Sequence, residues 1–138
     1  MGWRKSTHFL YIYISNMKEI AIVFIGGGLG SVLRYGVGKL FISSMSKFPM
    51  ATFLVNIIGC FLIGLLLAYF SKSANNFYKL FLVTGFCGGF TTFSTFSNET
   101  ILLFKNNQIT LALVYIISSL LLGLIATFVG YILLNKFL

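Results

Sequence analysis

The side chains best suited to chemistry are concentrated between Gly85 and Ser97, where paired glycines precede a run of hydroxyl groups. The hydroxyl residues are Thr91, Thr92, Ser94, Thr95 and Ser97. Glycine, serine and threonine are weak helix formers, so this segment is expected to interrupt any helix that contains it. Carbonyl groups released by such a break could hold a dehydrated cation, while the hydroxyls satisfy the remaining polar groups.

Phe93 and Phe96 belong to the same segment, lie one helical turn apart and would share one face of a helix. An aromatic ring carries partial positive charge on its edge, so a ring presented edge-on can favour a small anion. Packing between neighbouring helices explains the same spacing, and the spacing alone favours packing.

Asn56 and Arg34 are polar residues within apolar stretches. The Asn56 amide can donate hydrogen bonds to an anion that sheds water, or it can join two helices. Arg34 lies about 21 Å along a helix that starts at Ile20, where a charge must face a cavity or reach an interface. In one interpretation, the Arg34 side chain extends to the membrane–water interface and the glycines beside it allow tight helix packing. In the other, Arg34 supplies positive charge at a water-filled mouth.

A weaker polar stripe follows near the C-terminus, where Tyr115 and Ser119 fall at a four-residue interval. Gly123 continues the interval but adds no hydroxyl group. The stripe could line a polar track or pack against another helix, and the spacing alone favours packing.

Four apolar segments must position these residues, namely 20–41, 48–71, 80–104 and 108–134. A helix needs about 20 mostly apolar residues to cross a bilayer, and each segment is long enough. The polar joints between the segments leave no room for a soluble domain. We therefore predict an all-α membrane protein of four transmembrane helices with a broken third helix.

The composition supports a membrane location, because hydrophobic residues make up 58% of the chain and charged residues 9%, against about 25% charged residues in soluble domains. The net charge of +8 comes from basic residues that stand singly at the ends of apolar runs, so we expect contact with lipid headgroups and not with nucleic acid.

Cys60, Cys87 and His8 form no metal-binding spacing, and the two thiols are expected to be buried and unreactive. Acid–base groups are few and scattered, so we do not expect an enzyme.

Residues 1–16 are predicted to be an N-terminal extension, and residues 17–138 to form a single four-helix transmembrane domain. With four spans, and counting from residue 17, one side of the membrane carries Lys18, Lys72, Lys79 and Lys136, and the other carries Lys39, Lys47 and Lys105. Arg4 and Lys5 of the extension would raise the first count to six. Orientation depends on this bias, and four against three is nearly even. Either both orientations insert, as an antiparallel homodimer requires, or another feature fixes one topology.

Three motifs in order give the chain a resemblance to the Fluc (CrcB) family of fluoride channels. They are GGLGSVLRY from Gly27, TFLVNIIG from Thr52 and GFCGGFTTFSTFSNE from Gly85. The resemblance runs from about Lys18 to the C-terminus, and the third motif is its most specific part. It implies passive export of cytoplasmic fluoride by a multi-pass protein of the inner (plasma) membrane.

The resemblance also implies an antiparallel, dual-topology homodimer with two fluoride pores and a structural sodium ion at its centre. Main-chain carbonyls of Gly88 and Thr91 would bind the sodium ion, and Arg34 would lie near the vestibule. The implied pore residues are Asn56, Phe93, Ser94, Thr95, Phe96, Tyr115 and Ser119.

The main alternative is a small proton-coupled multidrug antiporter, which also forms a four-helix dual-topology dimer. That chemistry requires a carboxylate deep in the membrane. Glu19 lies at the entrance of the first span and Glu99 lies beyond the hydroxyl-rich segment, so neither has the expected place. A non-transporting membrane subunit is a third alternative, and it leaves a broken third helix unexplained.

Overall fold

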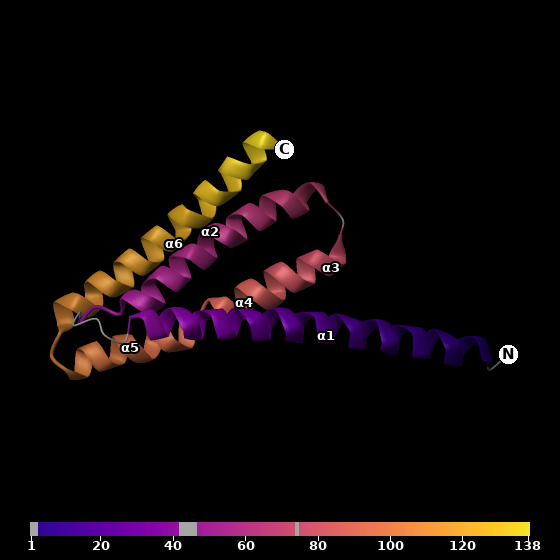
Figure 1. Ribbon diagram of the computed structural model, residues 1–138, viewed down its shortest axis with the longest axis horizontal. Helices are drawn as coiled ribbons and strands as arrows, with labels where there is room; N and C mark the ends of the chain where they lie inside the picture. The colour runs from indigo at the N-terminus through magenta and orange to yellow at the C-terminus, as the bar shows by residue number, and fades with distance from the viewer. Residues whose placement is uncertain (1–2, 42–46, 74) are drawn as a thin grey trace.

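The chain folds into long helices that are joined by short turns (Figure 1). The computed structural model describes residues 3–41, 47–73 and 75–138, with side chains from residue 16 onward. Residues 1 and 2 of the predicted extension 1–16 therefore lie outside the described part of the chain.

Within the described residues, four helical stretches are long and apolar enough to cross a membrane, at limits close to those predicted. Asn16–Leu40 belongs to α1 (Trp3–Leu40), which continues without a break across the predicted domain boundary after residue 16. The second is α2 (Met50–Lys72), the third is Asn76–Lys105, and the fourth is α6 (Ile109–Phe137). The prediction of an all-α, multi-pass membrane protein is thereby confirmed.

The third span is built from several pieces. A short helix α3 (Asn76–Lys79) leads into the π-helix η1 (Leu80–Cys87), which is followed by α4 (Gly88–Phe90). Thr91 and Thr92 then have extended backbones, with φ and ψ of −78° and 158° at Thr91 and −150° and 117° at Thr92. Helix α5 (Phe93–Lys105) begins directly after this extended pair.

Helix α1 packs against the third span at backbone contact distance, because glycines lie on both sides of the contact (Figure 1). A Cβ atom at Gly30 would overlap the Phe86 carbonyl oxygen and lie 2.7 Å from the Phe90 nitrogen. A Cβ atom at Gly89 would overlap the carbonyl oxygen of Gly27. Small residues allow such close approach between helices in a membrane.

Helices α2 and α6 form the second close pair and run side by side (Figure 1). Gly64 of α2 packs on the Thr127 carbonyl, and Gly130 of α6 packs on the Phe61 carbonyl. Each glycine permits a contact that a Cβ atom would block, so the two helices pack along their length through backbone surfaces.

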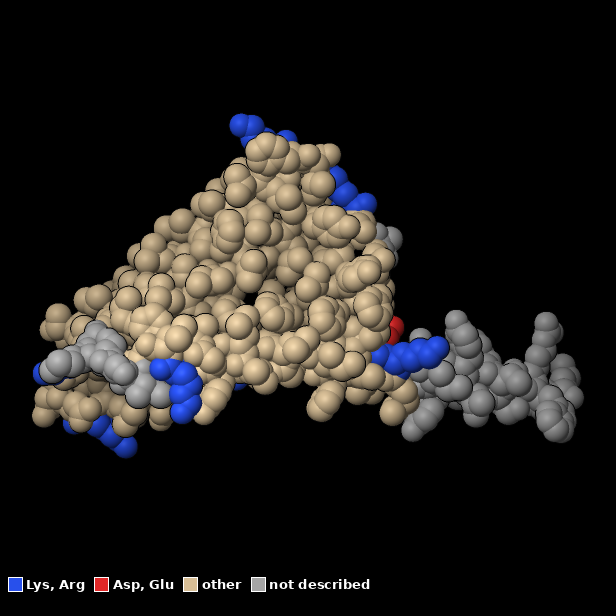
Figure 2. All heavy atoms as spheres, viewed as in Figure 1, with Lys and Arg blue, Asp and Glu red and all other residues tan. Residues whose placement is uncertain are grey.

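The outer surface is apolar between charged ends. Lys39, Lys72, Lys105 and Lys136 each lie in the last turn of a helix. On the face seen in Figure 2, lysine and arginine atoms lie toward the ends of the molecule, and most of the surface between them is uncharged. Large apolar side chains are exposed on the protein surface, including Phe24 at 80% and Leu124 at 72%. Such a surface is suited to lipid tails.

We predict that Gly30→Ala lowers the stability of the protein by about 2 kcal/mol, because the added methyl group meets rigid backbone on the third span. Gly28 is the matched control, since a Cβ atom at that position of the same helix meets nothing within 4 Å. Gly28→Ala should leave stability unchanged or raise it by up to about 1 kcal/mol. Unfolding in detergent measures both changes, and equal stability of the two variants would contradict the packing described here.

Candidate functional site

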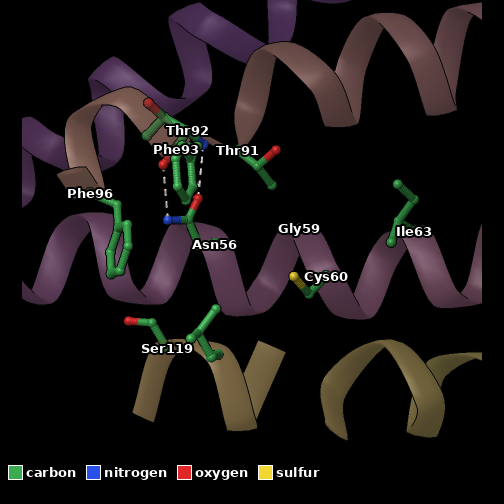
Figure 3. Close-up of a pocket in the computed structure, with 10 residues that line it drawn as sticks. Asn56, Gly59, Cys60, Ile63, Thr91, Thr92, Phe93, Phe96 and Ser119 are labelled. Atoms are coloured by element: carbon green, nitrogen blue, oxygen red, sulfur yellow. Dashed lines mark hydrogen bonds between the residues drawn. The ribbon is translucent and has the colours of Figure 1, made fainter. Parts of the chain in front are cut away.

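The side chain of Asn56 on α2 binds the main chain of Thr92 through both of its polar atoms (Figure 3). Its Nδ2 donates to the Thr92 carbonyl oxygen at 3.2 Å, and its Oδ1 accepts from the Thr92 N–H at 2.8 Å. These two hydrogen bonds satisfy the N–H and the carbonyl group of Thr92, whose extended backbone removes it from the hydrogen-bonding pattern of a helix. One of the two Nδ2 hydrogens takes part, so Asn56 keeps a second donor.

The hydroxyl groups of this segment mostly bond within the third span. Thr92 is the N-cap of α5, and its Oγ1 accepts from the Thr95 N–H at 3.2 Å. The same hydroxyl lies 3.0 Å from Thr95 Oγ1 and 3.3 Å from Ser94 Oγ. Thr91 Oγ1 donates to the Cys87 carbonyl at 2.9 Å. The Thr92 bonds start α5, the second helical part of the span, whereas the Thr91 bond reaches back to the end of the first part.

The carbonyl oxygens of Gly88 and Thr91 lose the partners that a continuous helix would give them. The N–H of Thr92, four residues after Gly88, goes to Asn56, and the N–H of Thr95, four residues after Thr91, goes to the Thr92 hydroxyl. Among the described residues, neither carbonyl accepts another hydrogen bond. Gly88 is exposed, and a Cβ atom there would meet nothing within 4 Å. Two free main-chain oxygens of this kind can bind a hard cation.

A cavity of about 240 Å³ lies between α2, the extended pair and α6 (Figure 3). Its lining includes Asn56, Thr92, Phe93, Phe96 and Ser119 and contains no charged residue. The Ser119 hydroxyl is buried and has no hydrogen-bond partner within the described residues. The rings of Phe93 and Phe96 lie 5.7 Å apart between centroids, and Phe93 is 77% exposed. The cavity lining therefore combines neutral polar groups with two phenylalanine rings.

Tyr115, a predicted pore residue, lies behind Phe96 and is fully buried. Its hydroxyl donates to Glu99 Oε2 at 2.8 Å, and Thr52 Oγ1 donates to Glu99 Oε1 at 2.8 Å. Sequence reasoning did not assign Glu99 or Thr52 to the site. The signal that could have revealed this cluster is a carboxylate within a membrane-spanning segment, because such a group needs polar partners.

A second cavity, of about 530 Å³, is lined by residues of α1, α2 and α5. Its polar lining residues are Ser31, Arg34, Tyr35, Lys39, Thr52, Thr92, Thr95 and Glu99. Arg34 Nε donates to the Gly89 carbonyl at 3.2 Å, and Ser31 Oγ donates to the same oxygen at 3.3 Å. Thr92 lines both cavities and so marks their common boundary.

The structure thus brings together Asn56, Phe93, Phe96 and Ser119 around the smaller cavity, and Arg34 and Thr95 around the larger one. Ser94 is exposed and lies beside Thr92, and Tyr115 joins the Glu99 cluster. The pore and sodium-binding roles of these residues stay predictions. No three His, Cys, Asp or Glu side chains gather into a metal-binding group in the described part of the chain.

Residues 21–131 match the protein family described as CrcB-like protein, Camphor Resistance (CrcB). A protein of Flavobacterium psychrophilum named fluoride-specific ion channel FluC is 52% identical over 120 residues, or 84% of this chain and 96% of the relative. A protein of the same name from Gloeothece citriformis is 48% identical over 122 residues, or 87% and 99% of the two chains. Another, from Elusimicrobium minutum, is 46% identical over 117 residues, or 83% and 92%.

We predict that Asn56→Ala destabilises the protein by about 3 kcal/mol, because it leaves the N–H and the carbonyl of Thr92 unpaired away from water. Unfolding in detergent measures the loss, and faster hydrogen exchange at the Thr92 amide would locate it. Asn98→Ala is the control, because Asn98 is exposed on α5, and it should change stability by less than about 0.5 kcal/mol. Equal stability of both variants would mean that the Asn56–Thr92 pair contributes nothing.

Proposed function

The chain belongs to the CrcB family, and from this premise we propose that it forms a fluoride-selective ion channel. The observation that carries the proposal is the 52% identity to a fluoride-specific ion channel over 96% of that relative's length. The neutral cavity supports it, since Asn56, Ser119 and two phenylalanine rings line one small space.

Fluoride holds its water tightly, so a selective pathway must replace that water with groups at close range. The second Nδ2 hydrogen of Asn56 and the unpartnered Ser119 hydroxyl are the neutral donors for this task. The edges of Phe93 and Phe96 supply weaker attraction without a full charge. Further polar groups would continue this pathway beyond the smaller cavity. They are Ser94 and Thr95 at the start of α5, and Tyr115, which bonds to Glu99.

The proposed assembly is an antiparallel homodimer with two pores, each built from both chains. From residue 17 onward, the nearly even distribution of lysines favours insertion in both orientations. The exposure of Phe93 at 77% and of Gly88 on the third span supports the assembly, because a partner chain would cover both. Residues 17–138 would form the single channel domain, and the segment before residue 17 would lie outside it.

A sodium ion is proposed to bind at the centre of this dimer, on the main-chain carbonyls of Gly88 and Thr91. The residues suit such an ion, because both oxygens lack their helical partners. A bound sodium ion would neutralise the partial negative charge of these oxygens and hold the two chains together. Asn56 and the Thr92 hydroxyl keep both oxygens available by occupying the competing N–H groups.

The proposed physiological role is passive export across the plasma membrane. Fluoride enters a cell as neutral hydrofluoric acid, dissociates and becomes trapped as the anion, so an open pathway lets it leave down its electrochemical gradient. The rival function, a proton-coupled multidrug antiporter, gains no support from the relatives, which are named as ion channels.

We predict that the purified chain in liposomes releases trapped fluoride but retains trapped chloride, because the neutral cavity is small and its donors suit a small anion. A fluoride electrode measures efflux after addition of a potassium ionophore, with sodium present or replaced by potassium. Flux should be lower without sodium. Equal chloride flux, or the absence of fluoride release in either medium, would contradict the channel.

We predict that Phe93→Ile and Phe96→Ile each lower fluoride flux at least about tenfold, because isoleucine fills similar volume but has no electropositive ring edge. Cross-linking in the same liposomes should show an unchanged dimer. Phe128→Ile is the matched control, since Phe128 is 65% exposed on α6 and lines neither cavity. Full flux in both Phe93 and Phe96 variants would assign these rings to packing.

A further inference from the structure

Two cationic residues line the larger cavity, Arg34 and Lys39, and their surroundings differ. Among the described residues, neither forms an ion pair with a carboxylate. Glu99 is the one acidic residue in the lining of this cavity, and its two oxygens accept from Thr52 and Tyr115. The positive charge of both residues is therefore left without a direct counter-charge, and the other contacts of each residue distinguish their roles.

Arg34 is engaged by the backbone of the third span. Its Nε and the Ser31 hydroxyl donate to the Gly89 carbonyl at 3.2 and 3.3 Å. In a continuous helix this oxygen would accept from the N–H of Phe93, which lies beyond the extended pair. The close approach of Gly89 to Gly27 brings the oxygen within reach of α1. Arg34 and Ser31 thus replace a helical hydrogen bond that the span has lost.

Lys39 is held differently, on the same helix one turn further along. Its ammonium group lies 5.2 Å from the centroid of the Tyr35 ring, within the range of a cation–π contact. The Lys39 and Tyr35 side chains are both exposed. An ammonium group on an aromatic face keeps its full charge and its access to solvent, whereas the Arg34 Nε–H is directed at a carbonyl oxygen.

We propose a division of roles between the two cations of this cavity. Lys39, held by Tyr35, supplies the charge that draws anions into the cavity, and Arg34 is a positioning residue that, together with Ser31, fixes Gly89 beside the extended pair. The Lys39 role rests on the proposed channel function. The Arg34 role rests on contacts within the chain and has a readout that needs no transport.

Ionic strength separates an effect of charge at a distance from an effect of contact. The Debye length falls from about 30 Å at 0.01 M to about 3 Å at 1 M, so steering by an exposed charge disappears at high salt. Initial fluoride efflux from liposomes is to be measured at both ionic strengths, set with an impermeant salt. Lys39→Gln should lower the flux about threefold at 0.01 M and leave it unchanged at 1 M. Lys105→Gln, the same change at the same end of the bundle but outside the cavity, should have no effect at either.

Arg34→Gln should lower the flux by the same factor at both ionic strengths, because the lost contact is not screened. It should also lower the midpoint of heat unfolding in detergent by about 5 °C. Ser31→Ala, which changes no charge, should cause the same kind of loss in milder form and remains a test if Arg34→Gln fails to fold. Because both donors share one oxygen, the double variant should lose less than the sum of the two single losses. Ser71→Ala is the control, since Ser71 bonds within its own helix.

The outcomes are distinct. A loss of flux in Arg34→Gln that vanishes at 1 M, or additive losses in the double variant, would overturn the positioning role. A Lys39→Gln defect that persists at 1 M, or no defect at 0.01 M, would overturn the steering role. If the unaltered chain passes no fluoride at all, the proposed function fails instead, while the unfolding measurements still decide whether Arg34 and Ser31 act on one carbonyl.

Discussion

The hydrogen-bonding demand of the backbone at Thr91 and Thr92 is the constraint on which the rest of the site depends. Inside a bilayer no water satisfies N–H and carbonyl groups that leave a helix, so side chains must do so. Asn56 binds both polar groups of Thr92, and the Thr92 hydroxyl accepts from the Thr95 N–H. The same contacts occupy the N–H groups that Gly88 and Thr91 would otherwise bind. One set of bonds therefore stabilises the extended pair and leaves two carbonyl oxygens open.

The glycines of α1 extend this constraint to the neighbouring helix. Gly26, Gly27 and Gly30 let the backbone of α1 touch the third span, which no larger residue at Gly30 would permit. Close contact places Arg34 Nε 3.2 Å from the Gly89 carbonyl oxygen, so this oxygen, like that of Thr92, accepts a hydrogen bond from another helix. The packing of α1 on the third span and the hydrogen bonding of the third span's backbone therefore depend on each other. A change in the packing would disturb these hydrogen bonds, and loss of the hydrogen bonds would disturb the packing.

Hydropathy and length predicted the four spans well, because crossing a bilayer fixes both. Composition also marked residues 85–97 as weakly helical, and the extended pair lies within that segment. The hydrogen-bond partner of Asn56 was not predictable, because Thr92 lies 36 residues away in the sequence. The sequence left open whether the Asn56 amide donates to an anion or joins two helices. The π-helix Leu80–Cys87 and the hydrogen bonds of Glu99 with Thr52 and Tyr115 depend on how the helices pack. The spacing of residues along one helix carries no information about that packing.

The separation of charged and neutral groups between the two cavities gives the proposed channel a physical logic. Arg34 and Lys39 line the larger cavity, whereas the smaller one is lined by neutral polar groups and two phenylalanine rings, and Thr92 borders both. A full positive charge at close range would hold fluoride too tightly for rapid passage, because conduction requires sites that an ion can leave. Positive charge is therefore best placed in the larger cavity, where Lys39 would raise the local anion concentration. In the proposed channel, the Asn56 amide and the Ser119 hydroxyl of the smaller cavity would replace water without holding fluoride too tightly.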